Sequence, residues 1–148
     1  MNPSADAVLR LVEAVDMAAG RFAEIEDRLL ADTGFSSARM RVAGVLEAAG
    51  AARTTPQIAR SLGLSRQAVQ RLADDLVERG LAAWSDNPDH RRAHLLGLTE
   101  EGREAHGQAL RRKGLWAEAM AEGLTPAWLA VATELLELMS RRSSLKKR

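Results

Sequence analysis

The feature that most restricts the fold of this chain is a pair of short helical patterns in residues 54–81, linked through a glycine. In "TTPQIARSLG", Thr55 is a predicted N-cap, and Pro56 suits the first helical turn because its missing N–H costs nothing there. In "LSRQAVQRLADDLVERG", Ser65 is the predicted N-cap and Gly80 the terminator. Two short helices joined by about four residues including a glycine form a helix-turn-helix. The apolar residues predicted to pack between them are Ile58, Ala59, Leu62, Leu64, Val69, Leu72 and Leu76.

An N-terminal helix with one apolar stripe is expected from Ala5 to about Ala31. Its apolar residues recur every three or four positions, which places them on one face: Val8, Leu11, Val15, Ala18, Phe22, Ile25 and Leu29. So long a helix near a terminus has too few residues of its own chain beside it to bury that stripe. This suggests that a second chain covers it. The next helix is predicted to have Ser37 as its N-cap and to end after Ala49 at Gly50.

After the helix-turn-helix, two short apolar runs, "LAAWS" and "AHLLGL", flank the turn "DNPDHRR", which predicts a β-hairpin. Helix is expected to resume with Thr99 as N-cap, to break near Gly123, and to begin again at Thr125 and Pro126. The last helix carries a second uncovered stripe, Leu129, Ala132, Leu135, Leu136 and Met139. The predicted fold class is therefore mainly α with a small β-hairpin.

The composition excludes several classes of protein. The absence of cysteine excludes a disulfide framework and thiol chemistry. The three histidines, His90, His94 and His106, are too scattered to indicate a metal site. No nucleophile with a base at a readable spacing and no phosphate-binding loop is found, so we expect neither an enzyme nor a cofactor. Apolar stretches are too short to span a membrane, and the N-terminus lacks a secretory signal, so a cytoplasmic protein is expected.

The small net charge of +1 hides a segregation of charge along the chain. Residues 36–98 hold nine basic and six acidic side chains, and residues 141–148 hold five basic and no acidic ones, whereas both remaining segments are net negative. The middle and the tail therefore favour anionic partners. The tail, Arg141 to Arg148, can add phosphate contacts, or it can be a frayed basic end that offsets the dipole of the last helix.

The second helix of the helix-turn-helix sorts its polar side chains along its length. Arg66, Gln67, Gln70 and Arg71 occupy its first two turns, and the acids follow. Guanidinium and amide groups can bond to guanine and adenine edges in the major groove, and recognition helices read bases with their N-terminal residues. Ser65 and Arg53 are candidates for contacts with the DNA backbone. The alternative is a solvated face without a function.

The tip of the predicted hairpin carries His90, Arg91 and Arg92. A basic loop beside a recognition helix is the arrangement of a wing, which can place arginine in the narrow minor groove. Without the preceding helices, the same residues would describe an ordinary surface turn with two solvated arginines.

The segment "TTPQIARSLGLSRQAVQRLADDLVERGL", followed by "DNPDHRRAHLLGLTEEG", resembles the MarR family of bacterial winged-helix transcription regulators. Among the matching features is the Leu-Thr-x-x-Gly start of the next helix, Leu98, Thr99 and Gly102. The resemblance extends over nearly the whole chain. It implies one MarR-like domain, residues 1–148, with a winged helix-turn-helix DNA-binding part in 36–99 and dimerisation helices in 1–35 and 100–148.

One residue of the wing departs from the family pattern. The family usually has aspartate two residues before its key wing arginine, where the acid braces the guanidinium, whereas His90 precedes Arg92 here. Either Asp89 substitutes from one residue away, or His90 contacts phosphate itself.

The resemblance also implies a homodimer that places two recognition helices in successive major grooves of a pseudo-palindromic site. The expected interface residues are Val8, Leu11, Val15, Leu129, Leu135, Leu136 and Met139. It further allows a pocket for a small apolar or phenolic effector, for which Trp116, Phe35 and Met40 are the candidate residues. Alternatively, Trp84, Trp116 and Trp128 fill the core or an interface, as most tryptophans do.

The resulting hypothesis is a sequence-specific regulator that binds double-stranded DNA, acting as a ligand-responsive repressor. Two other functions stay open. An architectural DNA-binding protein would show strong salt dependence and no preferred site. A winged-helix module that binds another protein is the second alternative, because a fold alone does not determine function.

Overall fold

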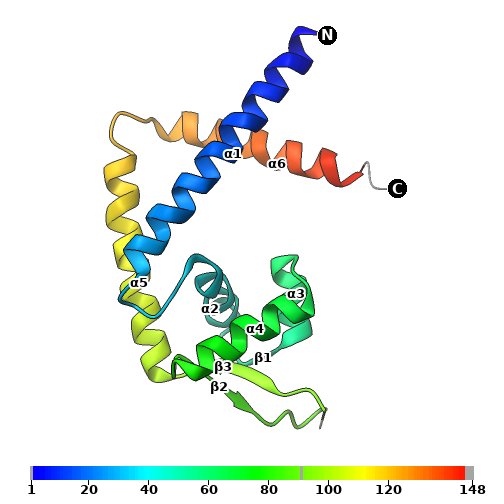
Figure 1. The fold of residues 1–148 in the computed structure, drawn as a ribbon, viewed down its shortest axis with the longest axis vertical. Coiled ribbons are helices and arrows are strands. Elements are labelled where there is room, and N and C mark those ends of the chain that lie inside the picture. Colours follow the sequence, from blue (N-terminus) through cyan, green and yellow to red (C-terminus); the bar gives the residue numbers. More distant parts are fainter. Residues whose placement is uncertain (1, 91, 146–148) are drawn as a thin grey trace. The chain divides into compact units, whose positions relative to one another are not determined.

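The computed structural model describes residues 2–90 and 92–145, with side chains to residue 143 (Figure 1). The chain divides into two compact units, residues 1–113 and 114–148. In chain order the elements are α1 (Pro3–Leu30), α2 (Ser37–Ala49), β1 (Arg53–Thr54), α3 (Thr55–Leu62), α4 (Arg66–Glu78), β2 (Ala82–Ser85), β3 (Leu95–Leu98), α5 (Glu100–Met120) and α6 (Pro126–Leu145). The mainly helical fold with a small β component is thus confirmed. Arg91 and Lys146 to Arg148 lie outside the described residues.

Two of the predicted N-caps lie one residue too far along the chain. The cap of α2 is Ser36, not Ser37, and its Oγ accepts a hydrogen bond from the Arg39 N–H at 3.4 Å. The cap of α3 is Thr54, not Thr55, because Gln57 completes a capping box with it. Thr54 Oγ1 accepts from the Gln57 N–H at 3.4 Å, and Gln57 Oε1 accepts from the Thr54 N–H at 2.9 Å.

The first helix begins at Pro3, two residues before the predicted Ala5, because Asn2 caps it. The other predicted caps are confirmed. Ser65, Thr99 and Thr125 each accept a hydrogen bond from the backbone N–H three residues on, at 3.1, 3.0 and 3.3 Å respectively. Gly63 ends α3 with φ +64°, a left-handed conformation that side chains disfavour, and this allows the tight connection into α4.

The first unit is built around a core to which α2, α3, α4 and the sheet all contribute. The fully buried side chains include Val42, Ile58, Val69, Leu76 and Leu96. The sheet has the order β1-β3-β2 and is antiparallel throughout, with Ala82 opposite Leu98 and Arg53 opposite Leu96. The predicted hairpin is therefore present. The strand β1 was not predicted, since a strand of two residues carries no alternation to detect.

Ion pairs connect the end of α1 with α5 inside the first unit. Arg112 donates to the Leu29 carbonyl at 3.1 Å and to Asp32 Oδ2 at 2.9 Å. The next residue of α5, Lys113, forms an ion pair with Glu26 of α1. These contacts hold the C-terminal end of α1 against α5, whereas Leu30 is the one buried residue of α1 itself among those described.

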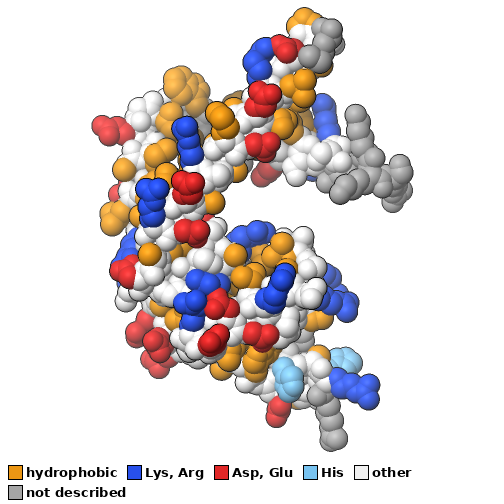
Figure 2. Space-filling view, in the orientation of Figure 1, with side chains coloured by type: hydrophobic (Ala, Val, Ile, Leu, Met, Phe, Trp, Pro, Cys, Tyr) orange, Lys and Arg blue, Asp and Glu red, His pale blue; other side chains and the backbone are white. Residues whose placement is uncertain are grey.

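The predicted apolar stripe of α6 is largely open to solvent in the single chain, since Leu129, Leu135 and Leu136 are exposed and Met139 is half-buried. The stripe of α1 is exposed at Val8 and Phe22 and half-buried at its other positions, and hydrophobic side chains lie among the charged ones along α1 (Figure 2). The apolar surface of α6 is wider than the stripe. Trp128, Val131 and Leu138, at spacings of three and seven, add a second exposed apolar face. In the described part of the chain, no helix is long and apolar enough to cross a membrane.

His106 is a buried titratable group of the first unit, with a side chain only 6% exposed. Its ring meets Phe35 edge-on, with 6.0 Å between ring centroids. Burial lowers the pKa of His106. The negative charge of nearby Glu47 raises this pKa, and the positive charge of Lys113 lowers it further. The folded state therefore favours the neutral imidazole.

We expect His106 to make folding pH-dependent. The unfolded chain protonates this histidine near pH 6.5, above its folded pKa, so its contribution to stability is complete above pH 6.5 and is lost as the pH falls through the folded pKa. Urea unfolding of His106→Gln at pH 7.5 and 5.5 is expected to show less loss of stability at the lower pH than the wild type. His90→Gln, at an exposed position of the wing, should retain the wild-type loss. Equal losses in wild type and His106→Gln would contradict this assignment.

Candidate nucleic-acid interface

The helix α4 is divided into an inward apolar face and an outward polar face, as predicted. Val69, Ala73 and Leu76 are buried, with Leu72 and Val77 partly buried beside them. The four candidate base-reading residues, Arg66, Gln67, Gln70 and Arg71, are all exposed. The polar first two turns are thus open to a ligand, because the core holds the helix by its opposite face.

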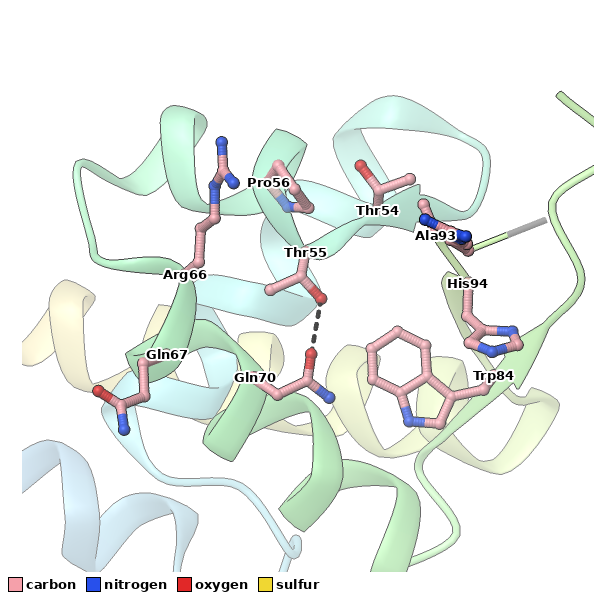
Figure 3. A pocket seen from close by; sticks show the side chains of 10 residues that line it. Thr54, Thr55, Pro56, Arg66, Gln67, Gln70, Trp84, Ala93 and His94 are labelled. Atoms are coloured by element: carbon pink, nitrogen blue, oxygen red, sulfur yellow. Dashed lines mark hydrogen bonds between the residues drawn. The ribbon is translucent and has the colours of Figure 1, made fainter. Parts of the chain in front are cut away.

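A hollow of about 630 Å³ brings α4 together with α3 and the wing (Figure 3). Its lining consists of Thr54, Thr55, Pro56, Arg66, Gln67, Gln70, Trp84, Arg92, Ala93 and His94. Three candidate base-reading residues and one wing arginine therefore line a single surface. Arg71 does not line it. Arg53 lines a different hollow, beside Gln57 and residues of α2.

The hydrogen bonds of Gln70 join the two helices on this surface. Thr55 Oγ1 donates to Gln70 Oε1 at 3.1 Å, as Figure 3 shows, and Gln70 Nε2 donates to Asp74 Oδ1 at 2.9 Å. Gln70 keeps further hydrogen-bonding capacity, since an amide offers two donors and two acceptor sites.

Asp75 fixes α4 to the rest of the first unit from the side away from the hollow. It pairs with Arg39 of α2, and it accepts from Arg79 Nε at 3.0 Å. Arg39, 17% exposed, also donates from Nε to the Gly34 carbonyl at 3.1 Å. Burial opposes ionisation of Asp75, but the hydrogen bonds from Arg79 and Arg39 outweigh it and hold the pKa of this carboxyl below its usual value.

Asp75→Asn is expected to lower the free energy of unfolding by about 1 to 2 kcal/mol, because the amide loses the charge that Arg39 and Arg79 share. Glu78→Gln, an exposed charge change on the same helix, should leave stability nearly unchanged. Urea unfolding at pH 7 measures both. The difference in stability between the wild type and Asp75→Asn should shrink as the pH falls through the lowered pKa of Asp75, because the wild-type carboxyl then also loses its charge. Equal stability of the two variants at pH 7 would refute this anchoring role.

The wing tip is shaped by a local turn around Asn87. Its Oδ1 accepts from the Asp89 N–H at 3.1 Å, and its carbonyl accepts from the His90 N–H at 3.2 Å. Arg92 and His90 are exposed, and basic and histidine side chains gather at this end of the first unit (Figure 2). Among the described residues, the only charged contact at the wing is His94 Nδ1 to Asp86 at 3.8 Å, which requires a protonated imidazole. The bracing of Arg92 by Asp89, and the phosphate contact of His90, stay predictions.

Several residues of the hollow were not identified from the sequence as interface residues. Thr55 was assigned to a helix cap, Trp84 to the core or a protein interface, and His94 to no site. A threonine at the start of the first helix, facing the amide of the second, is detectable only once the two helices are packed. The sequence feature that could have identified Trp84 as an interface residue was its position in the predicted hairpin, next to the wing.

The candidate effector residues do not form a group within one unit. Phe35 and Met40 are buried in the core of the first unit, where Phe35 packs against His106. Trp116 belongs to the second unit. The effector site therefore stays a prediction. No cluster of three or more metal-ligating side chains occurs in residues 2–90 and 92–143.

Comparison with known proteins agrees with this geometry. A sequence model of the MarR family matches residues 33–93. The uncharacterized protein Rv2011c of Mycobacterium tuberculosis is 38% identical over 134 residues, which cover 90% of this chain and 92% of that protein.

Solved structures show the same fold. The MarR family transcription regulator SP03579 has a TM-score of 0.86 at 19% identity, covering 98% of this chain and 97% of that one. A mutant MarR from E. coli complexed with operator DNA has a TM-score of 0.80 at 21% identity, covering 90% and 96%. The transcriptional repressor CouR, bound to a 23-mer DNA duplex, has a TM-score of 0.78 at 26% identity, covering 86% and 89%.

A helix-turn-helix with an adjacent hairpin wing defines the class of winged-helix proteins. Within that class, the match over residues 33–93 places the chain in the MarR family of transcription regulators. It is accordingly a regulator and not an enzyme.

Proposed function

We propose that the protein is a cytoplasmic, homodimeric repressor that binds a pseudo-palindromic site in double-stranded DNA and is released by a small ligand. The observation that carries the proposal is the hollow in which the polar N-terminal half of α4 faces the wing residue Arg92. Arg66, Gln67 and Gln70 offer the donors and acceptors that read base edges, and Arg92 offers a charge for the minor groove or the phosphates.

The proposed roles follow the position of each side chain. Exposed Arg71 extends the base-reading surface beyond the hollow. Ser65 and the open N–H groups of the first turn of α4 hold a phosphate. Arg53, half-buried and outside the hollow, contacts only the backbone of the duplex. Arg91 and His90 add wing contacts.

The homodimer is supported by the exposed apolar faces of α1 and α6. Water in contact with so many leucine, valine and tryptophan side chains is unfavourable, and a second copy removes it. The predicted interface residues lie on these two helices: Val8, Leu11 and Val15 on α1, and Leu129, Leu135, Leu136 and Met139 on α6. Sedimentation equilibrium is expected to give twice the chain mass, and the double variant Leu135→Lys/Leu136→Lys is expected to dissociate into monomers.

A ligand response is supported by the relatives. CouR of Rhodococcus jostii has been solved with p-coumaroyl-CoA, and the structure of BpsR of Bordetella bronchiseptica describes regulation of its DNA binding by 6-hydroxynicotinic acid. Both molecules carry a hydroxylated aromatic ring, and for this protein we propose a small apolar or phenolic effector.

Fluorescence anisotropy with a labelled genomic duplex, titrated at several salt concentrations, tests DNA binding against the two alternatives. A sequence reader is expected to bind its site at least about 1000-fold more tightly than random duplex. An architectural protein would bind both duplexes equally and lose affinity steeply with salt. Absence of binding to any duplex would favour a protein partner and overturn the proposal.

A further inference from the structure

The polar network on the outer surface of the helix-turn-helix fixes the amide of Gln70. Thr55 Oγ1 donates to its oxygen at 3.1 Å, and its nitrogen donates to Asp74 Oδ1 at 2.9 Å. Thr55 begins α3, whereas Gln70 and Asp74 lie one turn apart on α4, so the network spans both helices. Figure 3 shows the Thr55 hydroxyl directed at Gln70 across the hollow.

The chemistry of the partners determines which way the amide lies. A carboxylate only accepts hydrogen bonds, so the NH₂ group of Gln70 must face Asp74. The amide oxygen then faces Thr55, whose hydroxyl can donate to it. The reversed amide would place its oxygen against the carboxylate, which costs one hydrogen bond and adds a repulsion. Asp74 therefore selects the orientation, and Thr55, whose hydroxyl donates to the amide oxygen, holds the amide in it. One N–H and one oxygen lone pair of Gln70 stay available.

We propose that Thr55 and Asp74 set the base specificity of Gln70 by holding its amide in the orientation that reads adenine. The inference rests on the proposed function, since it assumes that α4 enters the major groove. Adenine presents an N6–H donor beside its N7 acceptor, which match the oxygen and the NH₂ of one amide. Thr55 and Asp74 are thus positioning residues, and Gln70 makes the base contact.

The held orientation discriminates chiefly against guanine. Guanine presents two acceptors, O6 and N7, on the same edge. A freely rotating amide can turn its NH₂ group towards them. An amide held by Thr55 and Asp74 keeps its oxygen opposite one acceptor, so the guanine complex loses a bond and meets a repulsion. Removing either partner should therefore relax the choice of base at one position without changing the others.

The test compares duplexes that differ at one half-site position, using the best site selected by the wild type. Wild type is expected to prefer A·T over G·C about tenfold at one position of each half-site, and Gln70→Ala is expected to abolish this preference. Thr55→Val and Asp74→Ala should each reduce it to about threefold or less, whereas Thr55→Ser, which keeps the hydroxyl, should retain it. The measured quantity is a ratio of affinities, so the general gain in affinity from removing the Asp74 charge cancels.

Ser61→Ala is the matched control, because it removes a hydroxyl of the same helix. Among the described residues, that hydroxyl donates to the Gln57 carbonyl of its own helix, at 3.2 Å. This variant should keep the tenfold preference, and all variants should unfold at a similar urea concentration. Full discrimination in both Thr55→Val and Asp74→Ala would overturn the inference, as would a wild type without a Gln70-dependent adenine position. Failure of the wild type to select any sequence would instead show that the proposed function is wrong, and that outcome is visible before any variant is made.

Discussion

Gly102→Ala is expected to lower the free energy of unfolding by about 3 kcal/mol or more. A Cβ added at Gly102 would lie 1.8 Å from the Leu81 carbonyl oxygen and 2.8 Å from its carbon, and both are backbone atoms. The same carbonyl accepts a hydrogen bond from the Thr99 N–H at 3.1 Å, so it cannot move without breaking the start of α5. The methyl group must therefore push α5 away from the strand that supports the wing.

Gly107→Ala is the matched control for this prediction, since it lies five residues along the same helix. A Cβ there would meet only the flexible end of Arg111, at 3.6 Å. Alanine is the better helix former, so this variant should be as stable as the wild type or more stable by up to about 1 kcal/mol. Urea unfolding followed by circular dichroism measures both. Wild-type stability of Gly102→Ala would show that this close approach does not hold the wing and α5 together.

Arg71→Ala is expected to reduce affinity for the selected operator by at least about 30-fold. Each lost bidentate contact to guanine costs about 1 to 3 kcal/mol, and a homodimer loses one in each half-site. The loss should be confined to one base position, since duplexes already changed at that position should bind wild type and variant equally. Anisotropy titration of both proteins on both duplexes gives the four affinities required.

Two further variants separate base reading from a general loss of positive charge. Arg53→Ala should weaken binding to all duplexes by a similar factor and flatten the salt dependence, because a phosphate contact carries no sequence information. Arg28→Ala, an exposed charge change on α1, should leave affinity nearly unchanged. A uniform loss on every duplex for Arg71→Ala would assign Arg71 to the backbone and leave base reading to Arg66, Gln67 and Gln70.

Much of the fold could be predicted because local chemistry and long-range packing agree in this chain. The end of α3 at Gly63 and the caps at Ser65, Thr99 and Thr125 follow from backbone requirements that only a few residue types meet. The inward face of α4 followed from the spacing of Val69, Ala73 and Leu76. The two cap errors arose where serine or threonine occurs twice in succession. There the choice depends on a third residue, such as Gln57 for Thr54.

The candidate site was less predictable, because its residues meet only in three dimensions. Periodicity places Gln70 on the outer face of α4, but it does not show that Thr55 of another helix donates to its amide. Likewise, Trp84 and His94 join the hollow through the pairing of β2 and β3. The role of Gly102 was implied only by the family resemblance. Its physical reason, the approach of the Leu81 carbonyl, depends on a contact across 21 residues of chain.

Two copies of this chain are proposed to read DNA sequence with paired recognition helices. The decisive experiment is selection of bound duplexes from a random pool by the purified full-length protein, at low and moderate salt. We expect enrichment, at both salt concentrations, of an inverted repeat whose half-site centres lie about 10 base pairs apart. Binding that retains duplex at low salt without enriching any sequence would contradict this proposal.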